Sequence, residues 1–568
     1  MTTHENYGNS DDLPLIIQGG MGVGVSNWVL AKAVSMRGQL GVVSGTCVDS
    51  ILVRRLQDGD IGGHVRRAMA HFPIPHVAEA VLSKFFIADG RPPRTPYKAL
   101  PMYKQTVSLA RQQITMIAAF VEVWLAREGH SRPVGINLLT KVQMPNLPTL
   151  YGAMLAGVGY VLMGAGIPRE IPGVLDNLAN HDSVSIKFDV EGLAAGETEY
   201  LRFDPREHWS PGDLLYRPRF LAIISANSLA TSLARKATGR VDGFVIEAPT
   251  AGGHNAPPRG ELKLNEQGEP VYGERDIVDL DKMIELGLPF WLAGGAGSPE
   301  RLQAARAAGA AGIQVGTLFA YCEESGFTSA LKNQVRDGVM QGRVGVRTDP
   351  RASPTGYPFK IVEIEGVNSR AEGRKRCCDL GYLRTAYREE SGRLGYRCAA
   401  EPIDTYVKRG GQIEDTEGRK CLCNGLFANI GHAQVRNDDV DERPIITSGD
   451  ELACLGAFFG EHPQYTAGDV IEHLLSLHVA SNGHVASNGA ASSNGHGSLN
   501  GDHESNGHAP VNGQVALLNG QHANGNGSAN GNRSRSARDA EDADPADAVG
   551  RNGKGVANPA HVHSRVIA

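Results

Sequence analysis

Short apolar runs alternate with segments of helical periodicity along roughly the first 345 residues, and each run ends in a Gly-rich or polar loop. Buried parallel strands have continuous apolar sequences, and their alternation with helical segments is typical of repeated βα units. Eight such strands predict an α/β fold of the (β/α)8 TIM-barrel class. The expected strands are 15–18, 41–44, 134–138, 160–163, 220–225, 243–247, 289–293 and 312–315.

Helical segments lie between several of these runs, for example at 27–36 and 299–308, where Ser298 is placed to cap the second helix. Two interruptions break the regular spacing. Residues 47–132 insert mainly helical sequence after the second strand, and 186–190 with 199–203 predict an antiparallel hairpin within 183–205. Because loops at the carboxyl face of a barrel carry function, we expect the first insertion to cover the barrel mouth.

The sequence beyond the barrel changes character twice. Residues 346–478 are rich in Gly, Arg, Tyr and Cys, end in an amphipathic helix near 469–479, and predict a C-terminal cap. From residue 479 to 568 the composition is dominated by Ser, Asn, Gly and His. Such a tract has too little apolar surface to offset the entropy of ordering, so we expect a disordered tail whose histidines are solvated or bind metal loosely. The predicted domains are therefore 1–345, 346–478 and 479–568.

Charge and hydropathy exclude two classes of partner. The chain has 56 Lys and Arg against 62 Asp and Glu, a net charge of -6, and no basic stripe that would follow a nucleic acid backbone. The apolar helical stretch 114–126 contains Glu122 and is shorter than the roughly 20 residues that a membrane span needs. The N-terminal sequence shows no export signal. We therefore expect a cytoplasmic protein that binds neither nucleic acid nor membrane.

The first and third strands end in residues suited to a planar ring. Glycines allow close approach of a ring to the backbone, and Met offers a soft apolar contact. Asn137 in the third strand can offer both a donor and an acceptor to a ring edge, although a strand-end Asn also commonly bonds its own loop. A tight strand-to-helix turn is the alternative for the first segment. That segment is Gln18, Gly19, Gly20, Met21 and Gly22.

The loops after the seventh and eighth strands indicate a phosphorylated cofactor. They contain Ala293, Gly294 and Gly295 in one, and Gly316 and Thr317 in the other. Barrel enzymes often bind phosphate between these two loops, where small residues expose backbone N–H groups. Two ordinary glycine turns are the alternative.

His254 follows Gly252 and Gly253 in the loop after the sixth strand. The two glycines would let the loop fold toward a ring bound at the mouth. An imidazole, with a reference pKa near 6.5, can give or take a proton at neutral pH, which suits general acid-base catalysis. A solvated loop histidine is the other interpretation, but the neighbouring strand ends favour a catalytic one.

The order of these segments carries a resemblance to a known family. The chain resembles the nitronate monooxygenases, formerly called 2-nitropropane dioxygenases, a family that also includes flavin-dependent enoyl-acyl carrier protein reductases. The resemblance spans roughly residues 13–330. The matching segments are 17–22, 135–138, 251–254, 293–295 and 314–319.

The resemblance implies an FMN cofactor and a catalytic role for His254. It places Gly20, Met21 and Asn137 at the isoalloxazine ring. It places the glycines of the seventh and eighth loops and Thr317 at the phosphate. The implied reaction oxidises alkyl nitronates with O2 to a carbonyl compound and nitrite.

Two departures from the family concern the substrate. Asn255, Ala256, Pro257 and Pro258 precede Arg259, and both long additions lie outside the minimal family barrel. The additions resemble larger relatives from fatty acid and polyketide pathways, which are enoyl reductases. An NAD(P)H-dependent flavin reductase of enoyl thioesters therefore stays open as an alternative, and a non-catalytic binding barrel is a third hypothesis.

Five of the eight cysteines fall within one stretch of the expected cap. Their spacing is not that of paired CxxC motifs, so we expect free thiols and no metal, with a zinc or iron-sulfur site as the alternative. These are Cys377, Cys378, Cys398, Cys421 and Cys423.

Overall fold

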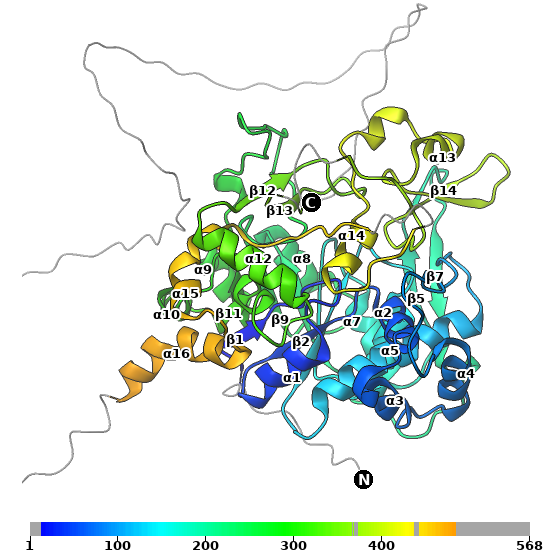
Figure 1. Cartoon of the computed structure of the whole chain (residues 1–568), viewed down its shortest axis with the longest axis horizontal. Helices are drawn as coiled ribbons and strands as arrows, with labels where there is room; N and C mark the ends of the chain where they lie inside the picture. The colour runs from blue at the N-terminus through cyan, green and yellow to red at the C-terminus, as the bar shows by residue number, and fades with distance from the viewer. Residues whose placement is uncertain (1–12, 366, 368–372, 437–441, 484–568) are drawn as a thin grey trace, which may run out of the picture. The chain divides into compact units, whose positions relative to one another are not determined.

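Eight parallel strands form the central sheet, in the order β1-β11-β10-β9-β8-β4-β3-β2. A parallel bridge between Ile17 and Leu40 joins the first strand to the segment that leads into the second, so the sheet curls into a barrel (Figure 1). The predicted (β/α)8 class is confirmed. The strands are β1 (Ile16–Gln18), β2 (Gly41–Ser44), β3 (Val134–Leu139), β4 (Tyr160–Gly164), β8 (Arg219–Ile224), β9 (Gly243–Glu247), β10 (Phe290–Ala293) and β11 (Gly312–Val315).

The computed structural model describes residues 13–365, 367, 373–436 and 442–483. Each predicted barrel strand is present, with ends that differ by at most one residue. The strands were predictable because both of their faces are buried. One face packs on the surrounding helices, and the other fills the barrel with a separate apolar cluster that includes Ile17, Val42, Leu162, Leu221, Val245 and Trp291.

Helices surround the barrel on its outer side. Ser298 caps α10 as predicted, since its Oγ accepts a hydrogen bond of 3.3 Å from the Arg301 backbone N–H. Asn27 caps α1 in the same way, through Leu30 N at 3.0 Å. The helices are α1 (Trp28–Met36), α5 (Leu109–Arg127), α6 (Asn146–Leu155), α7 (Ile171–Ala179), α8 (Asn227–Lys236), α9 (Leu280–Glu285), α10 (Pro299–Ala307), α11 (Thr317–Ala320) and α12 (Ser329–Met340), with the 3-10 turn η4 (Glu274–Asp276).

The insertion after β2 is helical as predicted, but it does not cover the barrel mouth. Its last helix, α5, packs against α1 and α6, and the other insertion helices pack against α5. Of the described residues in this insertion, only Cys47 lines the central cavity. The insertion helices lie away from the mouth because α5 is apolar and buried on nearly every side. The other helices of the insertion cover the apolar surface of α5. The other elements are α2 (Val48–Gln57), η2 (Ile61–Gly63), α3 (His64–Met69) and α4 (Pro75–Phe85).

The predicted hairpin is present. Its strands β5 (Val184–Phe188) and β7 (Glu199–Phe203) pair antiparallel. A short strand, β6 (Val190–Glu191), pairs with β14 of the C-terminal region, and η3 (Pro205–Glu207) follows.

The mouth is covered by residues from the C-terminal region. Phe359, Tyr382, Leu422 and Leu426 of this region line the central cavity. Its last helix reaches Gly483, beyond the predicted boundary at 479, and residues 484–568 lie outside the described residues. The elements are β12 (Gly345–Asp349), β13 (Phe359–Glu363), β14 (Thr385–Arg388), β15 (Leu394–Arg397), α13 (Ile403–Lys408), η5 (Ile413–Thr416), α14 (Leu422–Asn429), η6 (Asp450–Cys454), α15 (Gly456–Glu461) and α16 (Ala467–Gly483).

Candidate active site

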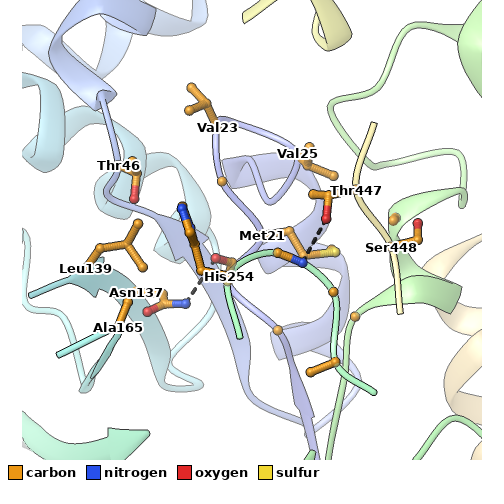
Figure 2. Close-up of a pocket in the computed structure, with 18 of the residues that line it drawn as sticks. Met21, Val23, Val25, Thr46, Asn137, Leu139, Ala165, His254, Thr447 and Ser448 are labelled. Carbon is orange, nitrogen blue, oxygen red and sulfur yellow. Dashed lines mark hydrogen bonds between the residues drawn. The ribbon is translucent and has the colours of Figure 1, made fainter. Parts of the chain in front are cut away.

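A cavity of about 230 Å³ lies at the carboxyl ends of the barrel strands. Figure 2 shows side chains of His254, Asn137 and Met21 around this cavity, with Thr447 and Ser448 of the C-terminal region on another side. Twelve of the fourteen predicted site residues lie in its wall: Gly19, Gly20, Met21, Gly22, Asn137, Gly252, Gly253, His254, Ala293, Gly294, Gly316 and Thr317.

The other two predicted residues, Gln18 and Gly295, lie outside the cavity wall. The Gln18 side chain is fully buried and holds two neighbouring segments together. Its Nε2 donates to Ser26 Oγ at 2.7 Å, and its Oε1 accepts from Val42 N at 3.0 Å. Gln18 therefore stabilises the turn after β1, and its amide group is already engaged.

The wall at Gly20 and Asn137 fits the edge of a planar ring. A Cβ on Gly20 would lie 2.2 Å from Asn137 Cβ, so only glycine allows this approach. Asn137 Nδ2 donates to Gly20 O at 3.1 Å, while Asn137 Oδ1 is buried without a partner. Gln314 Oε1, also in the wall, is buried and unpartnered as well. Buried acceptors without donors are costly, so a ligand with N–H groups at its edge suits this end of the cavity.

The wall after β10 and β11 fits an anion held by neutral donors. Gly294 has φ +90°, and a Cβ there would lie 2.9 Å from Thr250 Oγ1, so the loop requires glycine. Backbone N–H groups and the hydroxyl of Thr317 are the donors in this wall. No Lys or Arg is among the described lining residues, whereas the carboxyl of Glu451 is.

His254 is held from the C-terminal region. Its Nε2 lies 2.7 Å from Ser353 Oγ, and its ring meets the edge of Phe359 with centroids 4.8 Å apart. Burial, and secondly the charge of Lys141, hold the pKa of His254 well below its ordinary value. The imidazole is therefore neutral near pH 7 and has one ring nitrogen beyond its bond to Ser353.

Two further titratable groups, Lys141 and Glu247, lie near His254 and interact with each other. Burial lowers the pKa of Lys141 to about 7 and raises the pKa of Glu247 to about 7, and each charge partly opposes the shift of the other. Lys141 Nζ is buried without a hydrogen-bond partner and lies 3.9 Å from the centre of the Tyr357 ring. Such groups can change charge near neutrality and are candidates for binding or proton transfer.

Sequence reasoning missed Lys141, Glu247 and Glu451. Glu247 is the last residue of β9, and its place at a strand end was a usable signal. Lys141 lies in a loop and Glu451 in the short 3-10 helix η6, and their burial depends on contacts between distant parts of the chain.

A buried network fixes the wall at Tyr382. Its hydroxyl bonds Asp49 and lies 2.7 Å from Ser50 Oγ. Arg111 Nη2 lies 2.7 Å from Asp49 Oδ2, with both side chains almost fully buried at 4% and 1% exposure. The network joins α2 and α5 of the insertion to the C-terminal region, and so positions one side of the cavity.

The cysteines are all free thiols in the described structure. Cys47 and Cys423 line the cavity, and Cys378 hydrogen-bonds Cys398. Within the described ranges, no three His, Cys, Asp or Glu side chains are grouped so that they could hold a metal ion. None of the helices in the described part of the chain is long and apolar enough to cross a membrane.

Comparison with known proteins supports the resemblance. Residues 215–343, from just before β8 to the end of α12, match the family model described as nitronate monooxygenase. None of the curated proteins compared with the chain matches it in sequence.

Several solved structures align over most of the chain at low identity. FabK from Thermotoga maritima is 15% identical, covers 84% of this chain and 96% of its own, and has a TM-score of 0.40. A nitroalkane oxidase from Streptomyces ansochromogenes is 15% identical, with coverages of 84% and 99% and a TM-score of 0.43. The enoyl reductase domain of MlnA from Bacillus amyloliquefaciens is 11% identical, with coverages of 83% and 96% and a TM-score of 0.41.

The barrel, the cavity at its carboxyl face and the family match define the class of protein. The chain is an enzyme, a flavin-dependent oxidoreductase, and the alternative of a non-catalytic barrel is not retained. Its segment 215–343 matches the nitronate monooxygenase family model, in agreement with the resemblance seen in the sequence.

Proposed function

We propose that the protein is an FMN-dependent oxidoreductase of the nitronate monooxygenase type, with His254 as its acid-base residue. The observation that carries the proposal is one cavity that combines a ring-edge site at Asn137, a glycine-lined anion site at Gly294, and a buried neutral imidazole between barrel and cap.

The residues that would hold FMN divide by chemistry. Gly20, Met21 and Asn137 would contact the isoalloxazine ring, where Asn137 Oδ1 offers an unused acceptor. The ribityl phosphate would lie against the loops after β10 and β11. When bound, FMN would supply electron transfer, either between an alkyl nitronate and O2 or from NAD(P)H to an enoyl thioester.

His254 would act on the substrate as a neutral imidazole. Ser353 is bound to Nε2, which leaves Nδ1 to accept a proton from a neutral nitroalkane or to donate a hydrogen bond to a nitronate oxygen. A low pKa keeps the ring unprotonated and thus competent as a base at neutral pH. The Lys141 ammonium, when charged, would favour an anionic substrate nearby.

A second candidate is an NAD(P)H-dependent reductase of enoyl thioesters. The observation that favours it is the apolar wall added by the C-terminal region, which a nitronate of a few carbons does not require. In this reaction His254 would supply or orient the proton that reaches the α-carbon. The wall residues from the C-terminal region are Phe359, Leu383, Leu422 and Leu426, which line the cavity together with Leu139, Val142 and Ile223 of the barrel.

Anaerobic stopped-flow spectroscopy separates the two candidates. The protein loaded with FMN is mixed first with propyl nitronate and then, in a separate experiment, with NADPH followed by an enoyl thioester. Flavin bleaching by the nitronate, with nitrite formed after O2 is admitted, supports the first candidate. Rapid bleaching by NADPH and reoxidation by the enoyl thioester would instead establish the second.

A further inference from the structure

Residues 447–451 of the C-terminal region, here called the strap, lie on the loops that carry the proposed site. Gly253 N donates to Thr447 Oγ1 at 2.7 Å, the bond drawn in Figure 2. Gly449 N donates to Thr317 Oγ1 at 3.1 Å, and Asp450 N donates to Thr250 O at 3.0 Å. The strap therefore connects the histidine loop with the loops of the anion site.

The carboxyl group of Glu451 is placed among the donors of the anion site. It hydrogen-bonds Thr317 and the backbone of Gly295, which belong to the two glycine-containing loops. Its Oε2 is buried and has no hydrogen-bond partner. A buried acceptor that lacks a donor is unfavourable, so this carboxyl is incompletely satisfied where it lies.

Among the residues that the structure describes, no Lys or Arg forms a salt bridge with Glu451. The charged and titratable groups that face it are Asp450, which raises the Glu451 pKa further, and the hydroxyl of Tyr321. The nearby Lys360 forms a salt bridge with Asp450 instead, with 2.6 Å between Lys360 Nζ and Asp450 Oδ1. Burial is the largest cause of the raised pKa of Glu451. The hydrogen-bond partners of Glu451 among the described residues, Thr317 and the backbone of Gly295, are neutral donors.

A phosphate would need these same donors. Backbone N–H groups and a hydroxyl serve carboxylates and phosphates alike, and two anions within one set of donors repel each other strongly when little water separates them. The cavity wall contains Glu247 as its other carboxyl, and that group belongs to the end of β9.

We propose that the Glu451 carboxyl occupies the position of the cofactor phosphate, so that FMN binding displaces Glu451 and with it the strap. The inference rests on the proposed function, because it takes FMN as the ligand. Glu451 then weakens binding of FMN and leaves binding of riboflavin, which lacks the phosphate, unaffected. Thr447 of the strap accepts a hydrogen bond from Gly253 in the loop of His254, so displacement of the strap by the cofactor also changes the contacts that hold this loop.

The test compares two flavins on the full-length flavin-free protein. FMN and riboflavin are titrated by quenching of flavin fluorescence into the wild type, Glu451→Gln and the control Glu461→Gln, whose side chain is exposed. Glu451→Gln should bind FMN about tenfold more tightly or better, with riboflavin affinity and the control unchanged. In the wild type, the preference for FMN over riboflavin should fall as pH rises and Glu451 ionises, and in Glu451→Gln this fall should be smaller.

The outcomes are distinct. An unchanged or weaker FMN affinity in Glu451→Gln, with riboflavin binding normally, overturns the inference and leaves the proposed function standing. If neither flavin binds the wild type, the proposed function itself fails. Should Glu451→Gln not fold, as judged by circular dichroism, the wild-type pH dependence of the FMN preference decides alone, and a preference that does not fall with pH contradicts the inference.

Discussion

His254 is held by contacts from two distant parts of the chain, and its chemistry follows from that setting. The two glycines before it come from the barrel, while Ser353 and Phe359 come from the C-terminal region. Removal of the ring should leave the walls that receive FMN in place, because those walls are built mainly from the loops after β1, β3, β10 and β11.

His254→Ala should therefore bind FMN normally and lose turnover by about 10² to 10⁴, the usual contribution of a general acid or base. Steady-state rates and FMN titration measure the two effects. His76→Ala, at an exposed histidine, is the matched control. Full turnover in His254→Ala on the true substrate would show that the assigned role is wrong.

Burial is the main cause of the low pKa of His254, and the charge of Lys141 is the second. Because the charge of Lys141 lowers the pKa of His254, Lys141→Met should raise that pKa and move the acidic limb of the rate-pH profile to higher pH. Lys263→Met removes an exposed lysine and should leave the profile unchanged. A limb at the same pH in Lys141→Met and wild type would contradict the assignment.

At the scale of elements, the strands and helices of the barrel were predictable, but the origin of the cavity cover was not. Each barrel strand is buried on both faces and therefore has a continuous apolar sequence, as in β9. The glycines at Gly20 and Gly294 were recognisable because close approach and positive φ require that residue. Lys141 and Glu451 were missed because the sequence of a loop or of a short 3-10 helix does not reveal which distant segment buries it.

The buried pair of Asp49 and Arg111 is the main polar link between the insertion helices and Tyr382. Asp49→Asn would leave Arg111 buried without its charge partner, and should lower the free energy of unfolding by about 3 to 5 kcal/mol. Urea denaturation measures the change. Asp182→Asn breaks an exposed pair with Arg206 and should cost at most about 1 kcal/mol.

The stability that the Asp49–Arg111 pair contributes should decrease at acidic pH. Burial opposes ionisation of Asp49, but Arg111 and hydrogen bonds hold its folded-state pKa below the ordinary value. The stabilisation is therefore present above the unfolded pKa of about 3.9 and lost as pH falls through the lower folded pKa. If Asp49→Asn and Asp182→Asn were equally stable, this account of the link would be wrong.

At the scale of the whole molecule, the cavity joins residues from Gly19 to Glu451, so nearly the whole described chain is needed to form it. The last helix, α16, packs against α1 and α10 and buries Val470, Ile471 and Leu474. We propose that the boundary predicted between cap and tail lies after this helix.

A chain that ends at Gly483 should bind FMN and melt like the full-length protein, because the described cavity wall is complete before that point. A chain that ends at Thr466 exposes the apolar residues that α16 covers and should melt at a lower temperature. Calorimetry of the two truncated proteins checks this. Equal melting temperatures would show that α16 contributes nothing to stability.

The central claim is that FMN binds in the cavity beside His254, and the visible absorption spectrum tests it most directly. The purified protein, or the flavin-free protein after addition of FMN, should show the absorption of a bound flavin. Gly294 lies in the proposed phosphate loop, and Gly294→Val would place side-chain atoms against Thr250 of the neighbouring loop. This substitution should reduce the uptake of FMN. A colourless wild-type protein that takes up no added FMN would contradict the account.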